Sequence, residues 1–137
     1  MEIAINYLAV VVAAIAAYAV GAIWYSPVGF GKQWMKMMGF SKDDMRKMPL
    51  TATQAYILGF LFTLLISYVF AHFVVLVGAK GIAGTLTLAF WTWLGFGFTT
   101  LAHGWLYEGK SLKLFLFNAV HLLLAFFALA LVFGWWQ

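Results

Sequence analysis

Four long apolar stretches constrain this chain more than any other feature of its sequence. They run approximately over residues 3–25, 53–77, 82–106 and 112–136. A helix needs about 20 predominantly apolar residues to cross the hydrocarbon core of a bilayer, because each residue adds about 1.5 Å. In lipid the backbone hydrogen bonds must also close within each segment, which favours helices over open strands. The sequence therefore predicts an all-α integral membrane protein, a bundle of four spanning helices.

The composition excludes an ordinary soluble domain. Of the 137 residues, 66% are hydrophobic and 9% are charged, whereas soluble domains carry about 25% charged residues. The absence of cysteine excludes disulfides, thiolate metal sites and cysteine nucleophiles. The net charge of +4 does not indicate nucleic-acid binding, because the basic residues gather near the ends of the spans. We expect one transmembrane domain over residues 1–137, with the lipid bilayer as its partner and no nucleic acid.

The lysine and arginine residues predict the orientation of the spans. Seven of the eight lie in the connections after the first and third stretches, and only Lys80 lies in the second connection. Lysine and arginine are enriched on the cytoplasmic side of membrane proteins. We therefore expect a multi-pass protein of the cell (inner) membrane whose first and third connections face the cytoplasm and whose two termini both lie outside.

The first connection is the only long one, and residues 28–48 within it carry an amphipathic pattern. Apolar side chains recur at helical spacing and polar side chains fall on the opposite side. The apolar set is Phe30, Trp34, Met37 and Met38, and the polar set is Lys32, Gln33 and Lys36. This pattern is typical of a short helix that lies in the membrane interface. Ser41, with Asp44 three residues later, resembles a capping box and predicts a second short helix.

Two ladders of small residues predict where the first and second spans pack. In each ladder the residues are four apart, so they share one helical face. The ladders are Ala9, Ala13, Ala17 and Gly21 in the first span, and Gly59, Thr63, Ser67 and Ala71 in the second. Small residues let helix backbones approach closely in lipid. The pattern leaves open whether the ladders join two spans of one chain or two copies of the chain.

Polar residues on the third and fourth spans predict an interior polar face. The candidates, together with the residue that opens the first span, are Asn6, Thr92, Thr99, His103, Asn118 and His121. Polar groups are costly in lipid, so they usually face protein or water. The three histidines lie at three different depths, so they do not converge on one ion, and we expect no metal and no cofactor. A neutral, hydrogen-bonded His121 is the simplest interpretation; a role in a solute pathway is the alternative.

A second group of candidates lies at the predicted cytoplasmic end, and we call it the cytoplasmic corner. Its members are Trp24, Tyr25, Pro27, Lys32, Trp34, Glu108 and Lys113. Pro27 ends the first span, because proline disfavours helical geometry in the residue before it. For Glu108 two interpretations stand. Either it pairs with a lysine of the amphipathic segment 28–48 and fixes that segment to the bundle, or it is a solvated charge in a turn.

Two blocks of the sequence resemble the DUF1761 family of small membrane proteins. The blocks are "WYSP" with "FGK" and "WM" after Asn6, and Glu108 with "SLKLF" and Asn118 near the end of the chain. The resemblance covers nearly the whole chain and is looser around the second span. It implies a four-helix membrane protein and no particular activity. It also directs attention to the positions named for the cytoplasmic corner, and to Asn6 and Asn118.

No catalytic motif is present, so we assign no catalytic residue and consider an enzyme improbable. The sequence lacks HExxH, GxSxG, a P-loop and paired carboxylates within a span. The favoured function is a non-catalytic membrane module that self-associates or binds a larger membrane partner. The alternatives are a small homo-oligomeric permease or channel, and an enzyme or lipid binder that uses the cytoplasmic corner. A pore requires polar faces that meet around water, whereas a module leaves these faces closed by hydrogen bonds.

Overall fold

The computed structural model describes residues 3–137, and every regular element in this range is a helix. The elements are α1 (Tyr7–Trp24), α2 (Gly31–Met38), α3 (Lys42–Arg46), α4 (Ala52–Leu76), α5 (Gly81–Thr92), the π-helical η1 (Trp93–Phe98), α6 (Thr99–Tyr107) and α7 (Leu112–Trp135). Because α5, η1 and α6 are continuous, the described residues contain four helices long and apolar enough to cross a membrane. The predicted all-α class with four spanning helices is confirmed.

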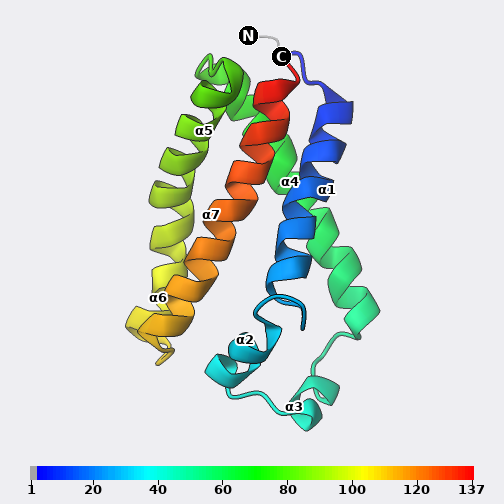
Figure 1. Cartoon of the computed structure of the whole chain (residues 1–137), viewed down its shortest axis with the longest axis vertical. Helices are drawn as coiled ribbons and strands as arrows, with labels where there is room; N and C mark the ends of the chain where they lie inside the picture. The colour runs from blue at the N-terminus through cyan, green and yellow to red at the C-terminus, as the bar shows by residue number, and fades with distance from the viewer. Residues whose placement is uncertain (1–2) are drawn as a thin grey trace.

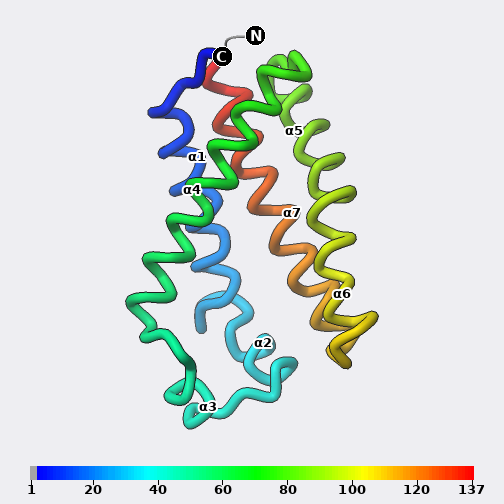
Figure 2. The backbone as a smooth tube through the Cα atoms, turned by 180° about the vertical axis from the view of Figure 1, so that it is seen from behind, coloured from blue at the N-terminus to red at the C-terminus, as the bar shows by residue number. Residues whose placement is uncertain are grey.

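The four long helices lie side by side, with α1 and α7 in the middle (Figure 1). Helix α1 packs against both α4 and α7, and α7 packs in turn against the continuous α5–η1–α6 helix. The carboxyl-terminal residue lies at the same end as the start of α1 (Figure 2). There the side chain of Gln137 accepts a hydrogen bond from the amide of Gly81 and donates one to the carbonyl of Ala79. We call this the terminal end of the bundle, and the opposite end, which carries α2 and α3, the corner end.

The buried core lies towards the terminal end. It is built largely from small residues of α1 and from the facing parts of the other long helices. Its members are Ala9, Val10, Ala13, Ala17, Phe70, Ala71, Val74, Ala89, Leu129, Ala130 and Phe133. Towards the corner end α4 diverges from α7 (Figures 1 and 2), and every residue from Ala52 to Leu58 is exposed. The bundle is therefore closed at one end and opens at the other.

The two small-residue ladders meet within one chain. The hydroxyl of Ser67 is fully buried and donates a hydrogen bond of 2.8 Å to the carbonyl of Val10. Ala13, in the middle of the first ladder, is 0% exposed. Gly59 lies beside the ring of Tyr18, whose hydroxyl donates to the carbonyl of Tyr56. These contacts join α1 to α4 from Val10 to Tyr18, whereas Gly21, the last member of the first ladder, lies against His121 of α7.

A close contact joins α5 to α7 in the same way. The hydroxyl of Thr85 donates a hydrogen bond of 2.7 Å to the carbonyl of Ala130. Gly134 makes the approach possible, because a β-carbon there would lie 2.6 Å from the Cα of Ile82. Small residues thus set the spacing at this interface, as expected where packing replaces the hydrophobic drive.

The π-helical turn changes which side chains of the third span face the bundle. A π-helix holds more residues per turn than an α-helix, so the residues that follow it are displaced from the α-helical register. Before the turn, Thr85 and Thr92 are buried; after it, Thr99 and His103 are exposed. The polar face that α-helical spacing predicts along the whole span therefore ends at Thr92, and the expected inward position of Thr99 is wrong.

Candidate functional site

The corner end is shaped by a sharp reversal of the chain after α1. The amides of Phe30 and Gly31 donate to the carbonyls of Trp24 and Ser26, at 2.8 and 2.9 Å. A β-carbon on Gly31 would lie 2.6 Å from the carbonyl oxygen of Tyr25, and one on Gly29 would overlap the backbone of the preceding turn. These two glycines let α2 begin directly beneath the end of α1. The reversal brings α2 against the start of α7.

A polar contact between distant parts of the chain lies beside this reversal. The hydroxyl of Tyr25 donates a hydrogen bond of 2.7 Å to Oδ1 of Asn118 on α7. The ring of Tyr25 also packs edge-to-face on His121, with centroids 4.9 Å apart, and on Trp34 of α2, with centroids 5.4 Å apart. Gly21 gives the imidazole room, because a β-carbon there would lie 3.0 Å from Nε2 of His121. Three helices are thus joined around one tyrosine.

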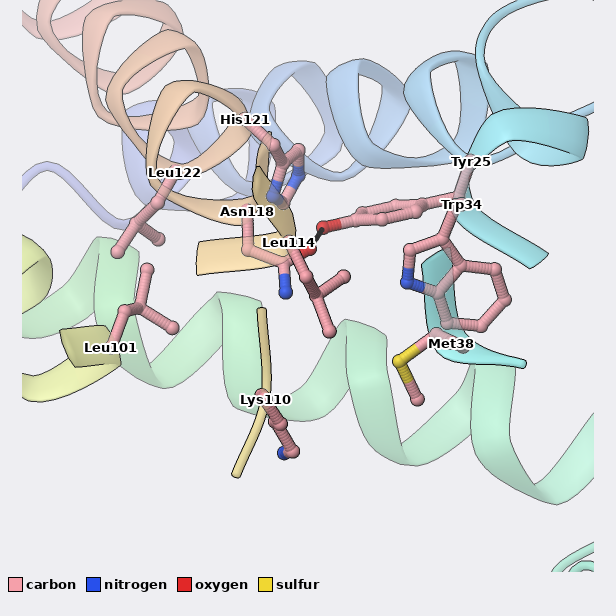
Figure 3. Close-up of a pocket in the computed structure, with 9 residues that line it drawn as sticks. All are labelled: Tyr25, Trp34, Met38, Leu101, Lys110, Leu114, Asn118, His121 and Leu122. Carbon is pink, nitrogen blue, oxygen red and sulfur yellow. Dashed lines mark hydrogen bonds between the residues drawn. The ribbon is translucent and has the colours of Figure 1, made fainter. Parts of the chain in front are cut away.

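The three helices and α6 line a cavity of about 490 Å³ (Figure 3), which we call the corner cavity. Its lining residues are Tyr25, Trp34, Met38, Leu101, Lys110, Leu114, Asn118, His121 and Leu122. A smaller cavity of about 190 Å³ shares Leu101, Lys110, Leu114 and Asn118 with it and extends to His103 and Glu108. The volume of the corner cavity, about 490 Å³, lies within the range typical of small-molecule sites, and that of the smaller cavity lies below it.

Comparison with known protein families identifies the family of the chain. A family described as "Protein of unknown function (DUF1761)" matches residues 8–134. The chain belongs to the DUF1761 family. The matched range includes both the reversal after α1 and the part of α7 that lines the corner cavity. Comparisons with curated proteins and with solved structures give no match.

The predicted polar interior of this DUF1761 protein is divided among several places. Asn118 and His121 lie together in the corner cavity, and His103 lines only the smaller cavity. Asn6 lies at the terminal end, where its Oδ1 caps α1 by accepting a hydrogen bond of 3.1 Å from the amide of Ala9. Thr92 is buried and donates to the carbonyl of Leu88 within its own helix.

The predicted cytoplasmic corner is divided in the same way. Tyr25 and Trp34 line the corner cavity. Trp24 does not line it and packs on the rings of Phe30 and Phe117, and its buried Nε1 has no hydrogen-bond partner in residues 3–137. The remaining members, Pro27, Lys32, Glu108 and Lys113, are exposed.

The predicted lock between Glu108 and a lysine of the amphipathic segment 28–48 is not formed. Glu108 instead pairs with Lys110 in its own turn, with 3.3 Å between Oε2 and Nζ. Both side chains are about half exposed, at 58% and 51%, and such exposed pairs contribute only about 0–1 kcal/mol. Glu108 is therefore paired within its own turn. The aromatic contacts of Tyr25 with Trp34 and His121 join α2 to the bundle instead.

Sequence reasoning missed five of the lining residues, which are Met38, Leu101, Lys110, Leu114 and Leu122. The leucines look like ordinary lipid-facing side chains, and Lys110 looks like a topology signal. One pattern does point to the site. Leu114, Asn118, His121 and Leu122 follow the spacing of one helical face, and that face lines the corner cavity.

The lining supplies hydrogen-bond donors more than acceptors. Oδ1 of Asn118 is taken by Tyr25, which leaves the amide nitrogen free for another partner. Trp34 and Lys110 contribute nitrogen donors only. Within residues 3–137 no three histidine, aspartate or glutamate side chains converge to hold a metal ion. The arrangement is suited to binding and orienting a molecule that accepts hydrogen bonds.

Proposed function

We propose that this protein is a non-catalytic membrane module that associates, within the bilayer, with a second copy of itself or with a larger membrane protein. The observation that carries the proposal is a line of small and polar residues on the outer face of the third span. Gly95, Thr99 and His103 are four residues apart, and all three are exposed. The change of helical register at the π-helical η1 leaves these residues on the outer face of the span.

The line has the composition of a helix–helix interface. No heavy atom lies within 4 Å of the place that a β-carbon on Gly95 would occupy, so this backbone is open to close approach. The hydroxyl of Thr99 donates a hydrogen bond of 2.7 Å to the carbonyl of Gly95. His103 makes no hydrogen bond within the described chain, and polar groups in a span usually face protein or water. Small residues beside such a group favour a second helix in this position.

The alternative is a small homo-oligomeric permease or channel, and the closed part of a single chain gives it little support. In the closed part of the bundle the buried hydroxyls of Ser67 and Thr85 are bonded to backbone carbonyls. Ala13, Ala89 and Ala130 are fully buried around them. A path for solutes through one chain would need polar groups free to hydrate the solute. The donors of the corner cavity lie on one side of this apolar core.

Photo-crosslinking in intact membranes tests the proposal. A photoreactive amino acid replaces Thr99 in one variant and Leu116, an exposed residue of α7, in the other. We expect protein adducts from position 99 and only lipid adducts from position 116. An adduct of twice the chain mass identifies self-association, and another mass identifies a partner.

A second substitution ties any adduct to the line itself. Gly95→Leu fills the open space and should abolish the adduct at position 99, because a large side chain holds the helices apart. Ala55→Leu places the same side chain at an exposed position of α4 and should leave the adduct unchanged. Lipid adducts alone at position 99 would contradict the proposal.

A further inference from the structure

The corner cavity is placed where a lipid could enter it. Its residues come from the end of α1 and from α2, α6 and α7, at the end of the bundle that carries seven of the eight basic residues. If the topology follows the basic residues, this end faces the cytoplasmic leaflet. His121 lies nine residues into α7, so the cavity reaches about 14 Å along that helix at 1.5 Å per residue. One part of the cavity is thus at head-group level and another at the level of acyl chains.

The polar part of the lining presents unpaired donors. Figure 3 shows the amide nitrogen of Asn118 directed away from Tyr25, and the amide makes no hydrogen bond through this nitrogen within the described chain. The indole nitrogen of Trp34 also has no acceptor among residues 3–137. Nζ of Lys110 has one partner, Glu108, in a half-exposed pair, and an ammonium group has three donors. An acceptor-rich, negatively charged group matches these donors.

The rest of the lining is apolar. Met38, Leu101, Leu114 and Leu122 supply side chains that match a hydrocarbon chain. An unbranched methionine adapts its shape to such a partner. Tyr25 belongs to both parts of the lining, because its hydroxyl fixes the amide of Asn118 while its ring packs on His121.

We propose that the corner cavity binds an anionic amphiphile, with a phosphate or carboxylate group on Asn118, Trp34 and Lys110 and a hydrocarbon chain among Met38, Leu101 and Leu122. Two sources carry this chemistry, a membrane phospholipid and a free fatty acid. Neither requires a charged residue in the middle of the bilayer, because Lys110 lies in the turn before α7.

Native mass spectrometry of the whole protein in an uncharged detergent tests the proposal. The probes are dioctanoyl phosphatidylglycerol, dioctanoyl phosphatidylcholine, decanoate and inorganic phosphate. We expect phosphatidylglycerol or decanoate to bind about tenfold more tightly than phosphatidylcholine, the effect of one charge-assisted hydrogen bond. Preference for phosphatidylglycerol alone identifies a phospholipid site, and preference for decanoate alone identifies a fatty-acid site. Equal binding of phosphatidylcholine, or binding of inorganic phosphate without any amphiphile, would overturn the proposal.

Two lysines provide a matched pair of variants. Lys110→Gln removes a charge from the lining of the corner cavity and should weaken the binding of the anionic amphiphile about tenfold. Lys113→Gln removes an exposed charge one turn away and should weaken this binding less than about twofold. Asn118→Leu should also weaken binding while keeping a side chain of similar size. Equal losses in the two lysine variants would mean a general attraction to the basic end and would reject the cavity. Circular dichroism of each variant checks that its helices are kept.

Discussion

At the residue scale, Gly31 decides whether the corner can form at all. Its position lies so close to the carbonyl of Tyr25 that a β-carbon would be 2.6 Å from the oxygen. The oxygen belongs to the backbone and a β-carbon is fixed rigidly to its own Cα, so neither can move aside cheaply. We expect Gly31→Ala to destabilise the protein by about 1–3 kcal/mol, the usual cost of overpacking, and to lower its midpoint of thermal unfolding in detergent. Gly95→Ala, where the added carbon meets open space, is the control and should leave stability equal or higher.

Asp44 gives the corner a dependence on pH. The amide of Ser41, and then its hydroxyl, donate hydrogen bonds to the carboxylate and hold the pKa of Asp44 below its usual range. Because the pKa of Asp44 is lower in the folded state, the ionised carboxylate stabilises α3 at every pH above the unfolded-state pKa. This stabilisation is lost as the pH falls through the folded-state pKa. We expect the ¹³C carboxyl shift of Asp44 to titrate below that of the same residue in an unfolded peptide. Ser41→Ala should move the midpoint up, and an unchanged midpoint would show that the cap is not formed in solution.

At the scale of the elements, α1 depends on its small residues for contact with both neighbours. Ala13 is 0% exposed and lies in the core between α4 and α7. Ala13→Leu would force these helices apart, and we expect a loss of about 1–3 kcal/mol of stability. Ile15→Leu, on the exposed face of the same helix, should change stability little. Thermal unfolding of the two variants in the same detergent makes the comparison, and equal midpoints would show that the ladder does not pack.

Much of this element structure follows from the sequence, and one element does not. The spans follow from the lengths of the apolar runs, and α3 follows from Ser41 and Asp44, whose reciprocal hydrogen bonds form as predicted. The π-helical turn does not follow, because Trp93–Phe98 is as apolar as its flanks. It coincides with a close contact between helices, since a β-carbon on Gly97 would lie 2.7 Å from Leu122. Tertiary contacts of this kind leave no local pattern.

The candidate site is predictable only in part, because its residues meet through tertiary contacts. Tyr25 and Asn118 are 93 residues apart and meet through one hydrogen bond. Each attracts attention separately, as an aromatic residue at the end of a span and as a polar residue inside one. Their pairing, and the leucines around them, depend on how α2 folds back beneath α1. Spacing along one helix cannot encode that.

At the scale of the whole molecule, the distribution of positive charge predicts the orientation in the membrane. The corner end holds seven lysine and arginine residues, in the two connections there and in the first turn of α7, and the α4–α5 turn holds Lys80 alone. Moving the corner end across the bilayer would mean translocating all seven, so we expect it to stay in the cytoplasm. The terminal end, with the start of α1 and Gln137, would then lie outside.

The absence of cysteine makes this orientation directly measurable. Lys80→Cys and Lys47→Cys place single thiols at exposed positions at opposite ends of the molecule. A maleimide that does not cross membranes should label position 80 in intact cells, and position 47 only after the cells are opened. Lys80→Cys also removes the one opposing charge, so it should not reverse the topology. Labelling of position 47 in intact cells would place the corner cavity on the outer face, and any anionic amphiphile would then have to come from the outer leaflet.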